Sequence, residues 1–184
     1  MSAATRPWAA QLLHLWFHRL RPAQWFGRNA SLDEELRRRF GRQLVALGNR
    51  QPAEFLGDPL TARAAILLFD QCPRNTLRDD PKAFAFDPLA LAICKGALAR
   101  GWDQGLTVPQ RQFIAMPLMH SEDIADQLAC LTLFAEFGSP FLLSFARSHW
   151  RMIAKFGRFP HRNEVLGRKS TPAELDAIAA GHAW

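Results

Sequence analysis

Leu67-Leu68-Phe69-Asp70-Gln71-Cys72-Pro73-Arg74-Asn75 is the stretch around which the fold of this chain is organised. A second stretch near the other end, Phe156-Gly157-Arg158-Phe159-Pro160-His161-Arg162-Asn163, has the same order of residue types. In both, an apolar segment leads into a proline and then into an Arg-Asn pair. Because proline has no backbone N–H and fits a helix interior poorly, each stretch is predicted to form a corner where polar side chains gather.

Start and stop signals for helices recur along the rest of the chain. Four times a capping residue stands directly before a proline, as is typical of a first helical turn, because the cap accepts backbone N–H groups and proline has none to leave unpaired. The four pairs are Asp58-Pro59, Asp87-Pro88, Ser139-Pro140 and Thr171-Pro172. No segment alternates polar and apolar residues as a strand does. The sequence therefore predicts an all-α fold of seven to eight helices, stacked as antiparallel hairpins.

Further predictions concern where helices begin and break. Ser31, with Glu34 three residues later, has the spacing of a capping box and is predicted to begin the second helix. Pro73 is predicted to break the third helix, and Pro117 to kink or end another, since a proline inside a helix removes a hydrogen bond. A further helix is expected over residues 121–137.

The length and composition of the chain favour a single globular domain, residues 1–184. Hydrophobic residues make up 48% of the chain, and 14 Phe with 6 Trp supply large side chains for a core. The net charge of +6 permits contact with a polyanion, but the charges are scattered. The densest basic cluster, residues 37–42, follows acidic residues on the same expected helix, which suits the helix dipole. The sequence therefore gives no strong nucleic-acid signal.

The cysteines indicate a reducing compartment. There are three, Cys72, Cys94 and Cys130, an odd number without the short spacing of a metal site. A cytoplasmic protein with no cofactor and no metal is therefore expected. No apolar run approaches the roughly 20 residues that span a bilayer, so no transmembrane segment is expected. The oligomeric state stays open.

Six stretches, in order along nearly the whole chain, share the residue pattern of one family. They are Leu15-Trp16-Phe17; Trp25-Phe26 with Leu32-Asp33 and Phe40-Gly41; Leu68 to Asn75; Ala83-Phe84 with Asp87; Met119 to Asp123 with Asp126-Gln127; and Gly157 to Asn163 with Leu166 to Arg168 and Ser170 to Pro172. On these residues the chain resembles the bacterial family catalogued as domain of unknown function 924 (DUF924). The resemblance implies a tetratricopeptide-like helical fold and no established activity. Cys72 stands where the family usually has phenylalanine, which predicts a change in local packing.

The first candidate site comprises Asp70, Gln71, Arg74 and Asn75. Asp70 and Arg74 are four residues apart, so they can pair along one helix face. One interpretation is a lock at a helix end, in which the Arg and Asn side chains satisfy the last carbonyl groups. The other is direct contact with a ligand.

The second candidate site comprises His120, Glu122 and Asp123, followed by Asp126 and Gln127. A histidine beside carboxylates can act as a general base, because its ordinary pKa lies near neutrality. A metal role is less favoured, since no second histidine stands at a ligand spacing. The competing interpretation is a capped helix start with a satisfied polar network.

The third candidate site comprises His161, Arg162 and Asn163, in a loop that also contains Arg158 and Arg168. Such a loop can hold a carboxylate or a phosphate, to which arginine binds through a bidentate fork. Alternatively, the loop clamps the C-terminal helix to the body of the protein.

These residues support three hypotheses for function. The first is the binding of an unknown anionic small molecule or peptide in a polar pocket formed by the three sites together. The second is a hydrolase-like enzyme that uses His120 or His161 with a carboxylate. The third is a protein–protein interaction scaffold with no catalytic site. The sequence contains no phosphate-binding glycine loop, no dinucleotide fingerprint and no nucleophile elbow, so whether the protein is an enzyme stays open.

Overall fold

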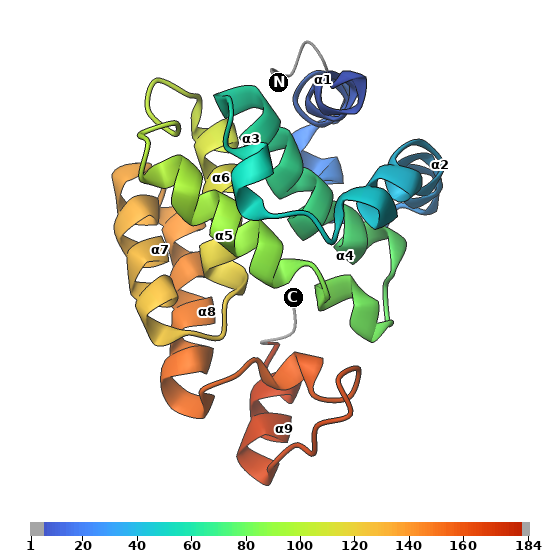
Figure 1. The fold of residues 1–184 in the computed structure, drawn as a ribbon. Helices are drawn as coiled ribbons and strands as arrows, with labels where there is room; N and C mark the ends of the chain where they lie inside the picture. The colour runs from blue at the N-terminus through green and yellow to red at the C-terminus, as the bar shows by residue number, and fades with distance from the viewer. Residues whose placement is uncertain (1–5, 182–184) are drawn as a thin grey trace. The chain divides into compact units, whose positions relative to one another are not determined.

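The computed structural model describes residues 6–181, and their regular structure is entirely helical (Figure 1). This confirms the predicted all-α class, because no strand occurs in that range. The chain divides into two compact units, with the boundary between Pro117 and Leu118. None of the helices in the described range is both long enough and apolar enough to cross a membrane.

Unit 1 is built around one buried helical run, residues 59–76, in which every residue from 61 to 73 is buried. Helix α3 of this run packs against α1 and α5, and α4 packs against α2. The α-helices of the unit are α1 (Pro7–His14), α2 (Ala30–Leu47), α3 (Pro59–Ile66), α4 (Cys72–Thr76), α5 (Asp87–Leu98) and most of α6 (Val108–His120). Two π-helical turns, η2 (Leu15–Arg19) and η5 (Leu67–Gln71), and three short 3-10 turns, η3 (Pro22–Gln24), η4 (Pro52–Phe55) and η6 (Pro81–Phe84), complete it.

Unit 2 contains a helical hairpin of α7 (Ile124–Glu136) and α8 (Pro140–Phe156), which pack along each other. A 3-10 turn, η7 (Pro160–Arg162), contacts the last helix, α9 (Pro172–Ala179). The buried cluster at this end comprises Met152, Ile153, Phe159 and Ala177. If residues 59–76 are counted as one helix, the described residues contain eight helices, within the predicted range.

The prediction that Pro73 breaks the third helix is wrong. The chain passes from α3 through η5 into α4 without a break. In η5 the backbone N–H of Cys72 donates to the carbonyl of Leu67, five residues earlier, as in a π turn. Pro73 then falls in the first turn of α4, where a missing N–H costs little. The wide turn therefore accommodates the proline, and the helix continues to Thr76.

Three other helix boundaries also differ from the sequence-based expectation. The second helix begins at Ala30, and its cap is Asn29, whose side chain accepts the N–H of Leu32 at 3.2 Å. The Asp87 side chain does not cap α5, although Asp87 is the first residue of that helix. Helix α6 continues through Pro117 as far as His120, so Pro117 does not end the helix, and the predicted alternative of a kink stays a prediction. In each case more than one local pattern was compatible with the sequence.

The remaining caps form as predicted. The Asp58 side chain accepts the N–H of Thr61 at 2.9 Å, and the Ser139 side chain accepts that of Leu142 at 3.3 Å. Thr171 caps α9 as predicted, and it forms a capping box with Glu174. Gly157 ends α8 in the left-handed conformation, with φ of 68°, which glycine adopts at low cost.

Gly48, at the C-terminal end of α2, is required because a larger side chain would clash with its neighbours, and not because its backbone adopts a conformation that favours glycine. Its φ is −64°, but a Cβ added there would lie 2.2 Å from Cε1 of Phe86. We expect Gly48→Ala to lower the free energy of unfolding by about 1–3 kcal/mol, as overpacking does, when measured by urea denaturation. Gly57→Ala is the matched control, because no neighbouring atom lies within 4 Å of its Cβ position. Equal stability of the two variants would contradict this account.

Candidate functional site

Arg74 is the centre of the first predicted site, in unit 1. Its guanidinium donates to both carboxylate oxygens of Asp87 at 2.8 Å and to the backbone carbonyl of Asp70 at 2.6 Å. It also lies 3.3 Å from the carboxylate of Asp70, a side chain with 0% exposure. Burial by itself would lower the pKa of Arg74, but the charges of Asp70 and Asp87 outweigh it and raise that pKa. Arg74 therefore stays charged between two carboxylates.

Side chains four residues further along the chain satisfy three successive carbonyl groups in this segment. The Arg74 guanidinium donates to the carbonyl of Asp70, and the Asn75 amide donates to the carbonyl of Gln71 at 3.1 Å. The Thr76 hydroxyl donates to the carbonyl of Cys72 at 2.8 Å. The Gln71 amide also donates to the carboxylate of Asp70. The structure thus brings Asp70, Gln71, Arg74 and Asn75 together through local contacts, as the predicted lock requires, but the carbonyl groups involved lie inside the helical run that continues to Thr76 and not at its end.

Arg78 extends this network to α2. It donates to both oxygens of Asp33, at 3.0 and 3.1 Å, and to the Asn75 side-chain oxygen at 2.9 Å. The pairing of Arg78 with Asp33 was not predicted, because the two residues are 45 positions apart in the sequence. Cys72, next to the lock, is buried, and burial raises the pKa of its thiol to about 12. It is therefore a packing residue and not a nucleophile.

The second predicted site lies at the turn between α6 and α7 in unit 2. One of its carboxylates caps α7, and another binds the loop that follows α8. Asp123 caps α7, accepting the N–H of Ala125 at 2.7 Å. Glu122 accepts the backbone N–H of Phe159 at 2.8 Å and two hydrogen bonds from Arg168, at 2.8 and 3.0 Å. Burial would raise the pKa of Glu122, but these donors outweigh it and hold that pKa below its usual value. The carboxylate is therefore ionised and fully engaged.

Gln127 closes the end of α6. Its amide donates to the carbonyls of Met119 and Ser121, each at 2.7 Å. The Ser121 hydroxyl donates to Asp126 at 2.8 Å. This is the polar network that the sequence offered as the alternative to a catalytic role.

The third predicted site divides into two parts. Asn163 donates to the Ser170 hydroxyl at 3.0 Å, and Arg158 pairs with Glu174 through bonds of 2.6 and 2.9 Å. The hydrogen bonds from Arg158 hold the pKa of Glu174 well below its usual range. These residues clamp the C-terminal segment, as one interpretation of the loop predicted.

His161 and Arg162 instead contribute to a histidine–arginine cluster around the ring of Phe159. The Arg162 guanidinium carbon lies 4.6 Å from the centre of that ring, and the rings of His149 and His161 each lie 5.6 Å from it. His120 follows at 6.4 Å from His149. We define the histidine–arginine cluster as His120, His149, His161 and Arg162.

His149 was missed by the sequence analysis. It lies on the buried face of α8 together with Met152 and Ile153, so its spacing is that of a core residue. Its Nδ1 lies 2.9 Å from the carbonyl of Phe145, which can only accept, so Nδ1 carries the hydrogen. Burial lowers the pKa of His149 to about 3, and the positive charge of Arg162 contributes to that shift.

The predicted residues therefore lie in two sets. Asp70, Gln71, Arg74 and Asn75 belong to unit 1, whereas His120, Glu122, Asp123, His161, Arg162 and Asn163 belong to unit 2. Within unit 2, contacts through Phe159 and Arg168 link the second and third sites. Between residues 6 and 181, no group of three or more His, Cys, Asp or Glu side chains is arranged to hold a metal ion.

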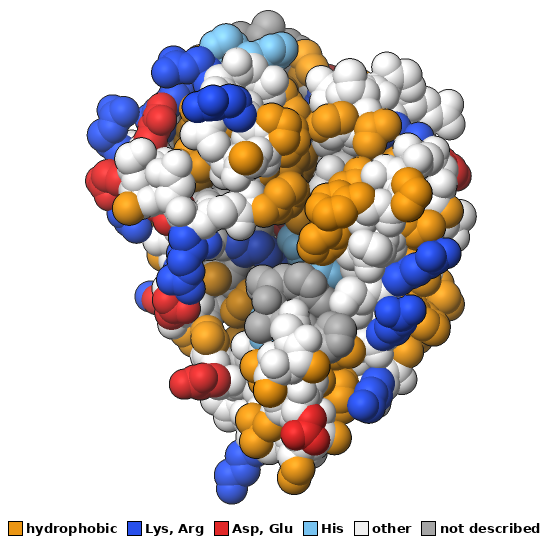
Figure 2. Space-filling model, turned by 180° about the vertical axis from the view of Figure 1, so that it is seen from behind, with side chains coloured by type: hydrophobic (Ala, Val, Ile, Leu, Met, Phe, Trp, Pro, Cys, Tyr) orange, Lys and Arg blue, Asp and Glu red, His pale blue; other side chains and the backbone are white. Residues whose placement is uncertain are grey.

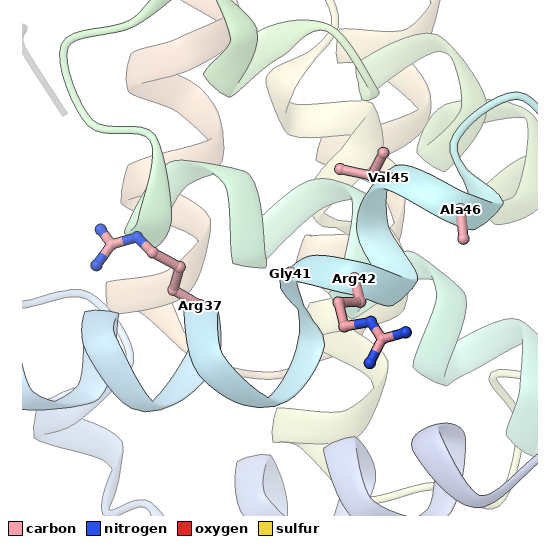
Figure 3. Close-up of a pocket in the computed structure, with 5 residues that line it drawn as sticks. All are labelled: Arg37, Gly41, Arg42, Val45 and Ala46. Carbon is pink, nitrogen blue, oxygen red and sulfur yellow. The ribbon is translucent and has the colours of Figure 1, made fainter.

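A shallow hollow on α2 contains none of the predicted residues (Figure 3). It is lined by Arg37, Gly41, Arg42, Val45 and Ala46, all from that one helix. The two guanidinium groups point away from each other, and Arg37 already contacts Glu34 and the carbonyl of Thr76. The pair therefore does not form a two-armed clamp for an anion.

Comparisons with known proteins agree with this helical architecture. The solved structure of a protein of unknown function from Agrobacterium tumefaciens superposes with a TM-score of 0.90 at 34% sequence identity, over 96% of this chain and 99% of that one. No curated protein matches the chain. The model of one family, described as bacterial protein of unknown function (DUF924), matches residues 12–182. The chain therefore belongs to the DUF924 family.

Proposed function

We propose that this protein binds an anionic small molecule or a peptide carboxylate through the histidine–arginine cluster of unit 2. The observation that carries the proposal is the gathering of two imidazoles, those of His149 and His161, and one guanidinium around the ring of Phe159. The ring of a third imidazole, His120, lies 6.4 Å from that of His149. Both Arg162 and His149 are only 6% exposed. The positive charge of Arg162 is thus buried beside the His149 imidazole, which it helps to keep neutral, and a bound anion would offset that charge and favour the protonated ring.

The chemistry of the cluster suits an oxyanion. A guanidinium presents paired N–H donors to a carboxylate or phosphate, and imidazole donates from either ring nitrogen once protonated. The nearby carboxylate of Glu122 is engaged by Arg168 and by the Phe159 N–H. The Glu122 contacts thus hold the loop in place while the cluster supplies the donors.

The predicted pocket that also includes Asp70, Gln71, Arg74 and Asn75 stays a prediction, and the binding proposal does not require it. Two further proposals accompany it. The tetratricopeptide-like arrangement rests on the family resemblance. A cytoplasmic location rests on the three cysteines, which are buried free thiols.

The test is a titration followed by NMR of the imidazole groups. Inorganic phosphate, succinate and a short peptide with a free C-terminal carboxylate serve as probes, against sodium chloride at equal ionic strength. We expect at least one probe to shift the His120, His149 and His161 signals saturably. His161→Gln is expected to weaken that binding about tenfold or more, because a charge-assisted hydrogen bond is lost.

His14→Gln is the matched control, since His14 is an exposed histidine of unit 1. It should leave the affinity unchanged. If no probe gives a saturable shift, or if His161→Gln and His14→Gln bind alike, the cluster is not an anion site.

A further inference from the structure

The exposed face of α8 carries a row of positive charges. Arg147, Arg151 and Lys155 follow one another at intervals of four residues, so they lie on one side of the helix. All three are exposed, while Ala146, His149 and the other core residues of α8 lie on the opposite side. The 17 residues of α8 include no Asp or Glu. The face therefore has one sign of charge along its length.

These cations differ from the arginines that form ion pairs within the protein. Arg74, Arg78, Arg158 and Arg168 each pair with a carboxylate. Over the described range, no carboxylate forms an ion pair with any member of the α8 row. The Lys155 ammonium lies 4.9 Å from the centre of the Phe156 ring. The charge of the row is thus available to an external partner.

An exposed aromatic pair stands at the start of the same helix. Phe141 is 69% exposed and Phe145 is 39% exposed, and their rings meet edge to face at 5.0 Å. Figure 2 shows a row of Lys and Arg side chains at its right edge, beside hydrophobic side chains. At about 100° per residue, the two rings lie on the flank of α8 between the cation row and the buried face, and exposed apolar rings that flank cations are the composition of surfaces that lie on membranes.

We propose that this α8 face, defined as Phe141, Phe145, Arg147, Arg151 and Lys155, docks the protein on an anionic lipid surface. The two rings enter the region of the lipid headgroups, and the three cations contact lipid phosphates. The contact is peripheral and reversible, because it involves one face of one helix.

A lipid surface suits this face better than a protein or a nucleic acid. The Phe rings project outward, and a projecting ring needs a matching pocket on a rigid protein partner, whereas a headgroup layer deforms around it. A nucleic acid would contact the cations, but two apolar rings contribute little to its binding unless they lie in a groove where bases stack on them. The anionic bilayer uses both kinds of side chain at once.

Vesicle pelleting of the full chain tests the proposal. We expect binding to vesicles of phosphatidylglycerol and phosphatidylcholine in equal parts, no binding to pure phosphatidylcholine, and release at high salt through screening. Each Lys or Arg near an anionic surface contributes about fivefold to partitioning, so the triple variant Arg147→Gln, Arg151→Gln, Lys155→Gln should bind about a hundredfold more weakly. Phe141→Ser with Phe145→Ser should weaken binding about tenfold.

A second triple variant distinguishes an effect of the α8 face from an effect of the protein's total net charge. Arg38→Gln, Arg42→Gln and Lys82→Gln remove the same total charge from exposed positions of unit 1, and this variant should bind like the unaltered protein. The proposal is overturned if both triple variants lose binding equally, if neutral vesicles bind as well, or if the serine variant binds undiminished. It is also overturned if the unaltered protein ignores vesicles yet binds duplex DNA through the same three cations.

Discussion

Arg74→Ala is expected to lower the free energy of unfolding by about 3–5 kcal/mol, the usual cost of removing one partner from a buried charge pair. The reason is the carboxylate of Asp70, which has 0% exposure and would lose its neighbouring cation. The Asp87 carboxylate would also lose two hydrogen bonds of 2.8 Å. Urea denaturation followed by circular dichroism measures the loss.

Arg28→Ala is the control for Arg74→Ala. Arg28 lies 3.7 Å from Asp79, and both side chains are 75% exposed, so its removal should change stability by less than about 1 kcal/mol. The alternative interpretation of Arg74 as a ligand contact makes the opposite prediction. If Arg74→Ala kept full stability but no longer bound any anion that the unaltered protein binds, the lock would be the wrong account of this residue.

His149 is expected to make the stability of the protein fall in mild acid. Its pKa is about 3 in the folded chain, against an ordinary value of 6.5. The unfolded chain therefore takes up this proton first as the pH drops, and the stability present above pH 6.5 is lost as the pH falls toward 3. Between pH 7 and pH 4 the loss from this one ring is about 3 kcal/mol.

His149→Asn removes this titration while keeping a donor near the position of Nδ1, which faces the Phe145 carbonyl. The variant is smaller and so less stable at pH 7, but its free energy of unfolding should fall about 3 kcal/mol less between pH 7 and pH 4. His14→Asn, at an exposed ring, should show the same pH dependence as the unaltered protein. A His149→Asn profile parallel to the unaltered one would mean that His149 is not the acid-sensitive group.

The features of the fold that could be predicted are those decided within one helical turn. Asp58, Ser139 and Thr171 cap their helices as expected, because a cap needs only its own side chain and a backbone N–H two or three residues away. Asn29 and Ser31 were both acceptable caps by that criterion, and the structure uses Asn29. The helix continues through Pro73 because of a π turn within a fully buried run, and no local sequence pattern predicts that π turn.

The candidate site shows the same division between local and distant contacts. The pairing of Asp70 with Arg74 follows from a spacing of four residues. The bond between Glu122 and Arg168 joins residues 46 apart, so nothing in the spacing indicates it. His149 was hidden for another reason, since a lone histidine on an apolar helix face has the pattern of a packing residue.

The π turn at Leu67–Gln71 has a consequence for how this family can vary in length. A π turn holds one residue more than an α turn, so a relative with a one-residue deletion there would regain a regular α-helix. The residues beyond the deletion would then keep their direction around the helix axis, because the deleted residue is the extra one that the π turn holds. The counterpart of Arg74 would therefore still face that of Asp87, whereas a one-residue deletion within the regular helix α3 would rotate every side chain beyond it by about 100°.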